Sequence, residues 1–149
     1  MTGYFSETKK CDLAETAESA IMKKYRLICE RNDVKDVFGY PGGVICHLMD
    51  SATKYADKIT FHINYHEQAS AFSACGYAQE SGKVGVAFAT SGPGATNLIT
   101  GIANAYFDST PTLFLTGQVD TYALKGELPI RQRGFQETDI VSMVKPITK

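Results

Sequence analysis

Blocks of apolar residues follow one another along the chain at spacings typical of helices and strands. Five segments are predicted as helices, at 13–31, 44–55, 67–80, 95–108 and 139–144. Four shorter apolar runs are predicted as strands, at 34–40, 58–64, 83–90 and 112–118. The run at 83–90 is almost continuously apolar, as in strands buried on both faces, and 112–118 is expected to be buried as well.

The order of these elements predicts the fold class. Strand and helix alternate at least three times, which favours an α/β fold with three layers, a parallel sheet with helices on both faces. Residues 1–12 are polar and are expected to form a flexible N-terminus, so the domain is placed at 13–149. Residues 147–149 resemble the start of another strand, and we expect the domain to lack its last helix and strand.

Composition narrows the function classes. The chain has 149 residues, 44% hydrophobic and 21% charged, which suits one globular domain with a real core. A net charge of -1 gives no reason to expect nucleic acid or an anionic membrane as a partner. No apolar run approaches a membrane span, and the N-terminus carries no targeting pattern, so a cytoplasmic protein is expected.

Two glycine-rich turns follow predicted strands, at 39–43 and 91–94. Neither matches the dinucleotide or nucleoside-triphosphate loop motif, so both standard nucleotide sites lack their signature. Because open α/β sheets bind ligands at the carboxyl ends of their strands, the turns are candidates for a shared site. Plain tight turns at a sheet end remain an equal alternative for either turn alone.

Glu67 is the main candidate for chemistry. It opens a helix of small residues, where a fixed carboxylate can hold a proton. The alternative is an exposed acid favoured by the helix dipole, and spacing alone leaves the two at even odds. His66-Glu67 lacks the second histidine of a metalloprotease, and the four cysteines match no zinc spacing, so no metal site is expected. The cysteines are expected to be small buried thiols.

Six motifs in fixed order resemble a known family. They are Phe38-Gly-Tyr-Pro-Gly-Gly43, His66-Glu-Gln68, Gly82-Lys-Val-Gly-Val86, Ala89-Thr-Ser-Gly-Pro-Gly-Ala-Thr-Asn97, Thr116-Gly-Gln-Val119 and Gly134-Phe-Gln-Glu137. Together they resemble the N-terminal pyrimidine-binding domain of thiamine diphosphate enzymes, and most closely the acetolactate synthase large subunit. The likeness covers 13–149 and implies the three-layer fold of that domain.

The resemblance implies roles for individual residues. Glu67 matches the acid that bonds a ring nitrogen of the cofactor's aminopyrimidine and favours its imino tautomer, which activates the thiazolium carbon. The positions that match cofactor-binding residues are Tyr40, Pro41, Gly42, Glu67, Thr90, Pro93 and Asn97. Gln136 matches a glutamine that faces the reacting centre, so the resemblance makes Glu67 and Gln136 the catalytic residues.

The resemblance also implies a reaction and partners. The parent enzyme would be a carboligase, a transferase that decarboxylates pyruvate or a related 2-keto acid and ligates the product to a second carbonyl. Thiamine diphosphate would be shared with a diphosphate-binding domain, which supplies the Mg²⁺ ligands through a Gly-Asp-Gly motif that this chain lacks. That domain would come from another chain or from a missing C-terminal region, in a homodimer or larger assembly. FAD is left open, and the isolated chain is expected to be inactive.

Departures from the family pattern keep alternatives open. Asp120 stands where the synthases usually have proline, and the loop at 120–135 is longer by roughly half a dozen residues. Arg131-Gln-Arg133 replaces the usual Thr-Asp-Ala. Another 2-keto acid or a sugar-derived compound therefore remains an alternative substrate. A subunit of a 2-keto acid decarboxylase and a non-catalytic interaction or regulatory module are the rival functions.

Overall fold

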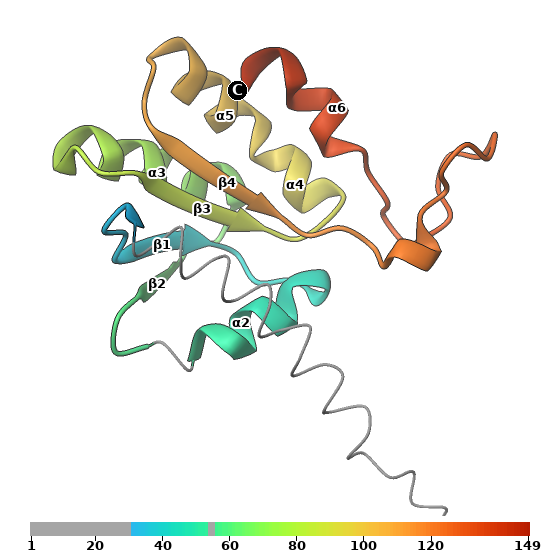
Figure 1. The fold of residues 1–149 in the computed structure, drawn as a ribbon, viewed down its shortest axis with the longest axis horizontal. Coiled ribbons are helices and arrows are strands. Elements are labelled where there is room, and N and C mark those ends of the chain that lie inside the picture. Colours follow the sequence, from blue (N-terminus) through green and yellow to red (C-terminus); the bar gives the residue numbers. More distant parts are fainter. Residues whose placement is uncertain (1–30, 54–55) are drawn as a thin grey trace, which may run out of the picture.

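A computed structural model describes residues 31–53 and 56–149 of the chain (Figure 1). The predicted flexible segment at 1–12 and nearly all of the predicted helix at 13–31 lie outside the described residues.

The described part is built on one parallel sheet of four strands. The strands are β1 (Asp36–Gly39), β2 (Thr60–Ile63), β3 (Gly85–Ala89) and β4 (Thr112–Thr116), in the spatial order β2-β1-β3-β4. All three strand pairs are parallel, as the alternation of elements predicts. β3 lies in the middle and is buried along its whole length, which confirms the prediction from its apolar run.

Helices cover both faces of this sheet. The α-helices are α2 (Cys46–Thr53), α3 (Glu67–Ser81), α4 (Pro93–Asn97), α5 (Ile99–Phe107) and α6 (Ile140–Val144), and the 3-10 turns are η1 (Gly43–Ile45), η2 (Thr121–Ala123) and η3 (Lys145–Ile147). α2 lies on one face, and α3 and α5 lie on the other (Figure 1). The three-layer architecture is therefore confirmed.

The two faces of β3 bury different side chains. Val86 and Phe88 join a core cluster on the α2 side, whereas Ala87 and Ala89 join a second cluster with residues of α3 and α5. α3 lies close against β3, because a Cβ atom on Gly85 would lie 2.0 Å from the carbonyl oxygen of Ala74 in α3.

The predicted helix at 95–108 is two helices. Gly92, with a φ of 61°, and Pro93 start α4 early, and α4 ends after one turn. The backbone N–H of Leu98 bonds the carbonyl of Ala95, three residues back, which tightens the chain before α5 begins. Leu98 is fully buried at this break, so the split helix still fills the core.

Three expectations about burial and strands are wrong. β4 is only half buried, because it forms an edge of the described sheet rather than an inner position. Residues 147–149 do not start a strand, because Ile147 ends η3 and packs towards the α5 side. Cys75 is buried as expected, but Cys46 is exposed.

The longest helix in the described ranges, α3, has 15 residues, and no helix there has the length and apolar character of a membrane span.

Candidate functional site

The turns that follow the strands meet at one edge of the sheet. Because the strands are parallel and in register, their carboxyl ends coincide. The N–H of Asn64 donates a hydrogen bond to the carbonyl of Gly39 at 3.0 Å. The N–H of Gly117 donates one to the carbonyl of Ala89 at 2.9 Å. The turns after β1, β2 and β3 therefore share an edge, as the sequence predicts. We call this the carboxyl edge.

Glu67 is the first residue of α3 at the carboxyl edge. The helix is capped by His66, whose backbone is extended and whose Nδ1 accepts a hydrogen bond from the N–H of Gln68 at 3.1 Å. Glu67 is buried, with only 9% of its surface exposed. The alternative of an exposed helix-start acid is thus wrong, whereas a catalytic role stays a prediction.

One oxygen of the Glu67 carboxylate is held by the chain. The side-chain amide of Asn97 donates a hydrogen bond of 2.9 Å to Oε2. Within residues 31–53 and 56–149, no hydrogen bond reaches Oε1. A buried carboxylate oxygen normally has a partner, so Oε1 is an acceptor available to a ligand.

Glycines shape the space beside this carboxylate. A Cβ atom on Gly94 would lie 3.2 Å from Oε1 of Glu67 and 2.7 Å from Cγ2 of Thr90. A Cβ atom on Gly42 would lie 2.5 Å from Cβ of Thr90. The turn after β1 and the start of α4 therefore both pack against Thr90 at the end of β3, and α4 also approaches Glu67.

The predicted site residues are only partly brought together. Glu67, Thr90 and Asn97 form one cluster with the two glycines. Tyr40 and Pro41 lie on the same edge, exposed, but make no hydrogen bond to that cluster. Pro93 is exposed at the first turn of α4.

Gln136 reaches the carboxyl edge from the far end of the chain. Its backbone is left-handed, with a φ of 56°. A Cβ atom on Gly92 would lie 2.7 Å from Cβ of Gln136 and 2.9 Å from its carbonyl oxygen. Glycine at 92 is thus required both by its own positive φ and by the approach of Gln136.

Two roles were not apparent in the sequence. Asn97 was expected to border the ligand, yet it bonds Glu67, and no local pattern indicates a contact across 30 positions. Glu137 accepts hydrogen bonds from the backbone N–H groups of Lys125 and Arg133, at 2.8 and 2.9 Å. These bonds hold the pKa of the Glu137 carboxyl below its usual range, the bond from Arg133 being the larger cause.

Comparison with known proteins identifies the family. Residues 26–143 match the family described as "Thiamine pyrophosphate enzyme, N-terminal TPP binding domain". The chain belongs to this family. The resemblance inferred from the six motifs is therefore confirmed.

Several relatives of this thiamine pyrophosphate enzyme domain are named acetolactate synthases. The chain is 49% identical over 116 residues to the acetolactate synthase large subunit of Lactococcus lactis, covering 78% of this chain and 19% of that protein. It is 48% identical over 123 residues to "Acetolactate synthase 1, chloroplastic" of Oryza sativa, covering 80% and 18%. It is 47% identical over 121 residues to the acetolactate synthase of Arthrospira platensis, covering 80% and 20%. The chain thus spans at most about a fifth of the length of these relatives.

The geometry of the site fits the aminopyrimidine ring of thiamine pyrophosphate. That ring needs a carboxylate that can form a hydrogen bond, and it needs to lie close to the backbone. Oε1 of Glu67, beside Gly94, offers both. In the described part of the chain, no three His, Cys, Asp or Glu side chains are grouped to hold a metal ion.

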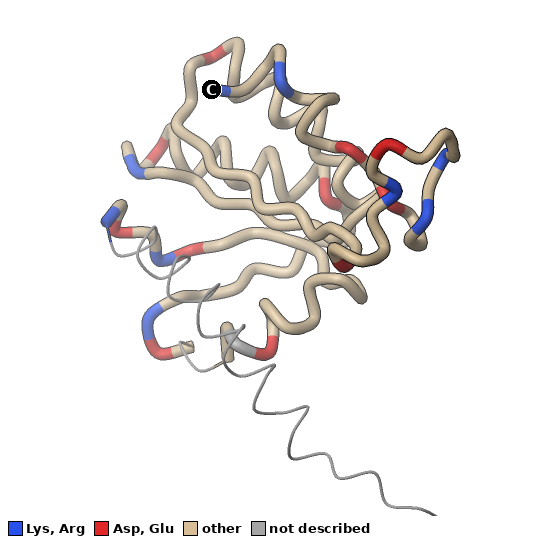
Figure 2. Tube along the Cα trace, turned by 45° about the vertical axis from the view of Figure 1, so that its right-hand side comes forward, with Lys and Arg blue, Asp and Glu red and all other residues tan. Residues whose placement is uncertain are grey.

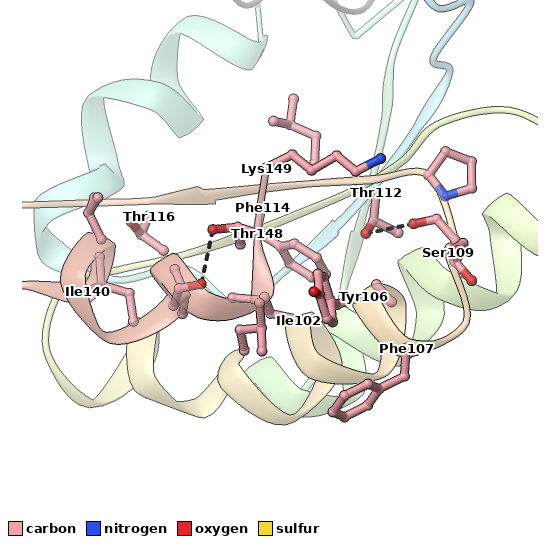
Figure 3. A pocket seen from close by; sticks show the side chains of 17 residues that line it. Ile102, Tyr106, Phe107, Ser109, Thr112, Phe114, Thr116, Ile140, Thr148 and Lys149 are labelled. Atoms are coloured by element: carbon pink, nitrogen blue, oxygen red, sulfur yellow. Dashed lines mark hydrogen bonds between the residues drawn. The ribbon is translucent and has the colours of Figure 1, made fainter.

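A groove lies away from the carboxyl edge, in the described part of the domain. It has a volume of about 890 Å³ and runs between α5, the edge strand β4 and the final turns of the chain (Figure 3). Ile102, Phe114 and Ile140 line it, with Thr148 bonded back to the carbonyl of Val144. None of its lining residues is a predicted site residue, so this groove is separate from the predicted site.

Proposed function

We propose that this chain supplies the pyrimidine side of the thiamine diphosphate site in a carboligase that resembles acetolactate synthase. The observation that carries the proposal is the carboxylate of Glu67, which is buried and held through Oε2 by Asn97, while no described residue bonds Oε1. The substrate of this carboligase would be pyruvate or a related 2-keto acid.

Each residue of the cluster has a separate task in this proposal. Oε1 of Glu67 would bond a ring nitrogen of the aminopyrimidine, while Asn97 keeps the carboxylate from rotating. Gly94 and Gly42 have no side chain where Thr90 approaches them, so the start of α4 and the turn after β1 can lie close to Thr90 beside the ring. When bound, thiamine diphosphate supplies the carbon nucleophile that attacks the 2-keto acid.

The site needs a second domain. The chain has no Gly-Asp-Gly motif, and the charged diphosphate with its Mg²⁺ would need oxygen ligands from a diphosphate-binding domain. We therefore place the active site at a contact between this chain and that domain, in a cytoplasmic homodimer or larger assembly.

The buried carboxylate distinguishes this proposal from a non-catalytic module. An unpartnered buried acceptor costs on the order of 1–3 kcal/mol, and a module that binds no ligand gains nothing from keeping one. The longer loop at 120–135 keeps a decarboxylase acting on another 2-keto acid as the second candidate, because the differences from the synthase pattern gather there.

The test is cofactor-dependent turnover by complementation. The chain alone should bind thiamine diphosphate and Mg²⁺ weakly or not at all in a calorimetric titration. Mixed with a diphosphate-binding domain, it should turn over pyruvate, and the products distinguish ligation from simple decarboxylation. Micromolar binding by the chain alone, or a mixture with no thiamine-dependent activity, would contradict the proposal.

A further inference from the structure

The loop between β4 and α6 is organised around one carboxylate. Oε1 of Glu137 accepts the N–H of Lys125 at 2.8 Å, and Oε2 accepts the N–H of Arg133 at 2.9 Å. The two donors are eight positions apart, so the carboxylate closes the intervening segment into a loop. Figure 2 shows acidic and basic residues interspersed along this loop, which projects from the domain.

Further contacts attach the same segment to the carboxyl edge. Nε2 of Gln118, just after β4, bonds the carbonyl of Thr138 at 2.6 Å. A Cβ atom on Gly134 would lie 2.9 Å from Cβ of Val119. Gln136 lies between these two attachments, with its left-handed backbone against Gly92. Gln136 is therefore held on both sides by contacts with residues that follow β4.

We propose that Glu137 is a positioning residue, whose carboxylate clamps residues 125–133 and thereby holds Gln136 against the glycine turn of the carboxyl edge. The role of Gln136 at the reacting centre rests on the proposed function. The clamp itself rests only on the two backbone hydrogen bonds. A left-handed non-glycine residue is strained, so it persists only where its surroundings fix it.

The clamp is specific to a carboxylate. Two backbone donors approach two different oxygens, and an ionised carboxylate offers acceptors on both. In Glu137→Gln, one oxygen becomes an NH₂ group that faces a backbone N–H, so one bond is replaced by repulsion at nearly constant volume. Glu137→Asp keeps the charge but is one methylene shorter, and it cannot reach both donors.

The first measurement uses the full 149-residue chain and needs no cofactor. Limited digestion with trypsin reports loop opening, because Lys125, Arg131 and Arg133 are cleavage sites within it. Glu137→Gln and Glu137→Asp should each raise the cleavage rate there by about tenfold, with little change in the global unfolding midpoint. Glu127→Gln is the matched control: it removes the same charge from an exposed position of the same loop, where the described residues show no hydrogen bond to Glu127.

The outcomes of this digestion distinguish the loss of the two backbone hydrogen bonds of Glu137 from the loss of a negative charge in the loop. Faster cleavage in the two Glu137 variants and parental cleavage in Glu127→Gln supports the clamp. Parental cleavage in the Glu137 variants, or equal acceleration in Glu127→Gln, overturns it. If Glu137→Gln does not fold, Glu137→Asp decides.

The second measurement tests the positioning of Gln136. In the chain complemented by a diphosphate-binding domain, Glu137→Gln should lower kcat as Gln136→Ala does, while hydrogen–deuterium exchange at the cofactor's thiazolium carbon stays near the parental rate. A loosened loop with unchanged kcat overturns the positioning role. If the complemented parent is inactive, the proposed function fails on its own, and the NMR Cα and Cβ shifts of Gln136 in the free chain decide whether Glu137→Gln releases its left-handed backbone.

Discussion

Asn97 and Glu67 are 30 positions apart in the sequence, and Nδ2 of Asn97 lies 2.9 Å from Oε2 of Glu67. An amide nitrogen only donates, so Oε2 must act as the acceptor in this bond. The other oxygen, Oε1, faces Gly94. The pair thus fixes the orientation of the carboxylate.

Asn97→Ala should reduce the contribution of Glu67 to cofactor activation, although the carboxylate itself remains. A hydrogen bond to a charged group contributes about 1.5–3 kcal/mol, so we expect thiazolium proton exchange in the complemented chain to fall by roughly tenfold or more. Thr96→Ala is the matched control, since Thr96 lies next to Asn97 in α4 and bonds the carbonyl of Pro93 instead. Equal losses in both variants would indicate a general effect on α4 and would refute the pairing role.

Two glycines should respond oppositely to alanine. At Gly94 a methyl group would press on Thr90 and crowd Oε1 of Glu67, so Gly94→Ala should reduce cofactor binding in the complemented chain. At Gly76, inside α3, a Cβ atom meets nothing within 4 Å. Gly76→Ala should therefore stabilise the fold by about 0.5–1 kcal/mol, because alanine loses less backbone entropy in a helix. Thermal unfolding of both variants, beside cofactor titration, checks the contrast.

The loop around Glu137 should open in acid. The pKa of Glu137 is below its ordinary value of 4.5 in the folded chain, because backbone N–H groups of Arg133 and Lys125 stabilise the charged form. A carboxyl with a depressed pKa contributes stability that is present above pH 4.5 and is lost as the pH falls through the folded pKa. The amide NMR signals of Lys125 and Arg133 should move in that window and stay fixed in Glu137→Gln. A titration retained in that variant would assign it to another group.

How far the sequence predicted the structure depended on the range of the contacts. The buried strand β3 and the helix α3 were both predicted correctly, because each follows from a local pattern of apolar or small residues. The position of Glu67 at a helix start was correct as well, but its burial depends on the approach of α4, through Gly94 and Asn97. The edge position of β4 depends on which strands pair, which its own apolar residues do not encode.

Association is expected on the face that carries the cluster. Tyr65 is 95% exposed just before α3, and Phe72, within α3, is 43% exposed. Exposed apolar side chains near a site that needs a second domain favour the burial of this surface against another subunit. We expect a homodimer or larger assembly with α3 and residues 92–97 near the contact. Sedimentation at high concentration checks this, with Phe72→Ser expected to weaken association. A strictly monomeric parent would refute it.

Glu67→Gln is the sharpest test of the site. Glutamine is nearly isosteric, so the packing at the start of α3 should change little, and unfolding of the free chain should be close to parental. The amide that replaces the carboxyl cannot supply the acidic proton that the aminopyrimidine needs. Turnover and thiazolium proton exchange in the complemented chain should therefore fall by at least ~10²-fold, the low end for losing a positioned proton-transfer group.

Gln136→Ala is the comparison that separates cofactor activation from later steps. It should slow turnover while leaving thiazolium proton exchange near normal, because Gln136 belongs to the substrate side of the proposed site. Hydrogen–deuterium exchange and steady-state turnover are measured in both variants. If Glu67→Gln exchanges as fast as the parent, Glu67 is only a buried acid at the start of α3, and its free Oε1 has no part in activating the cofactor.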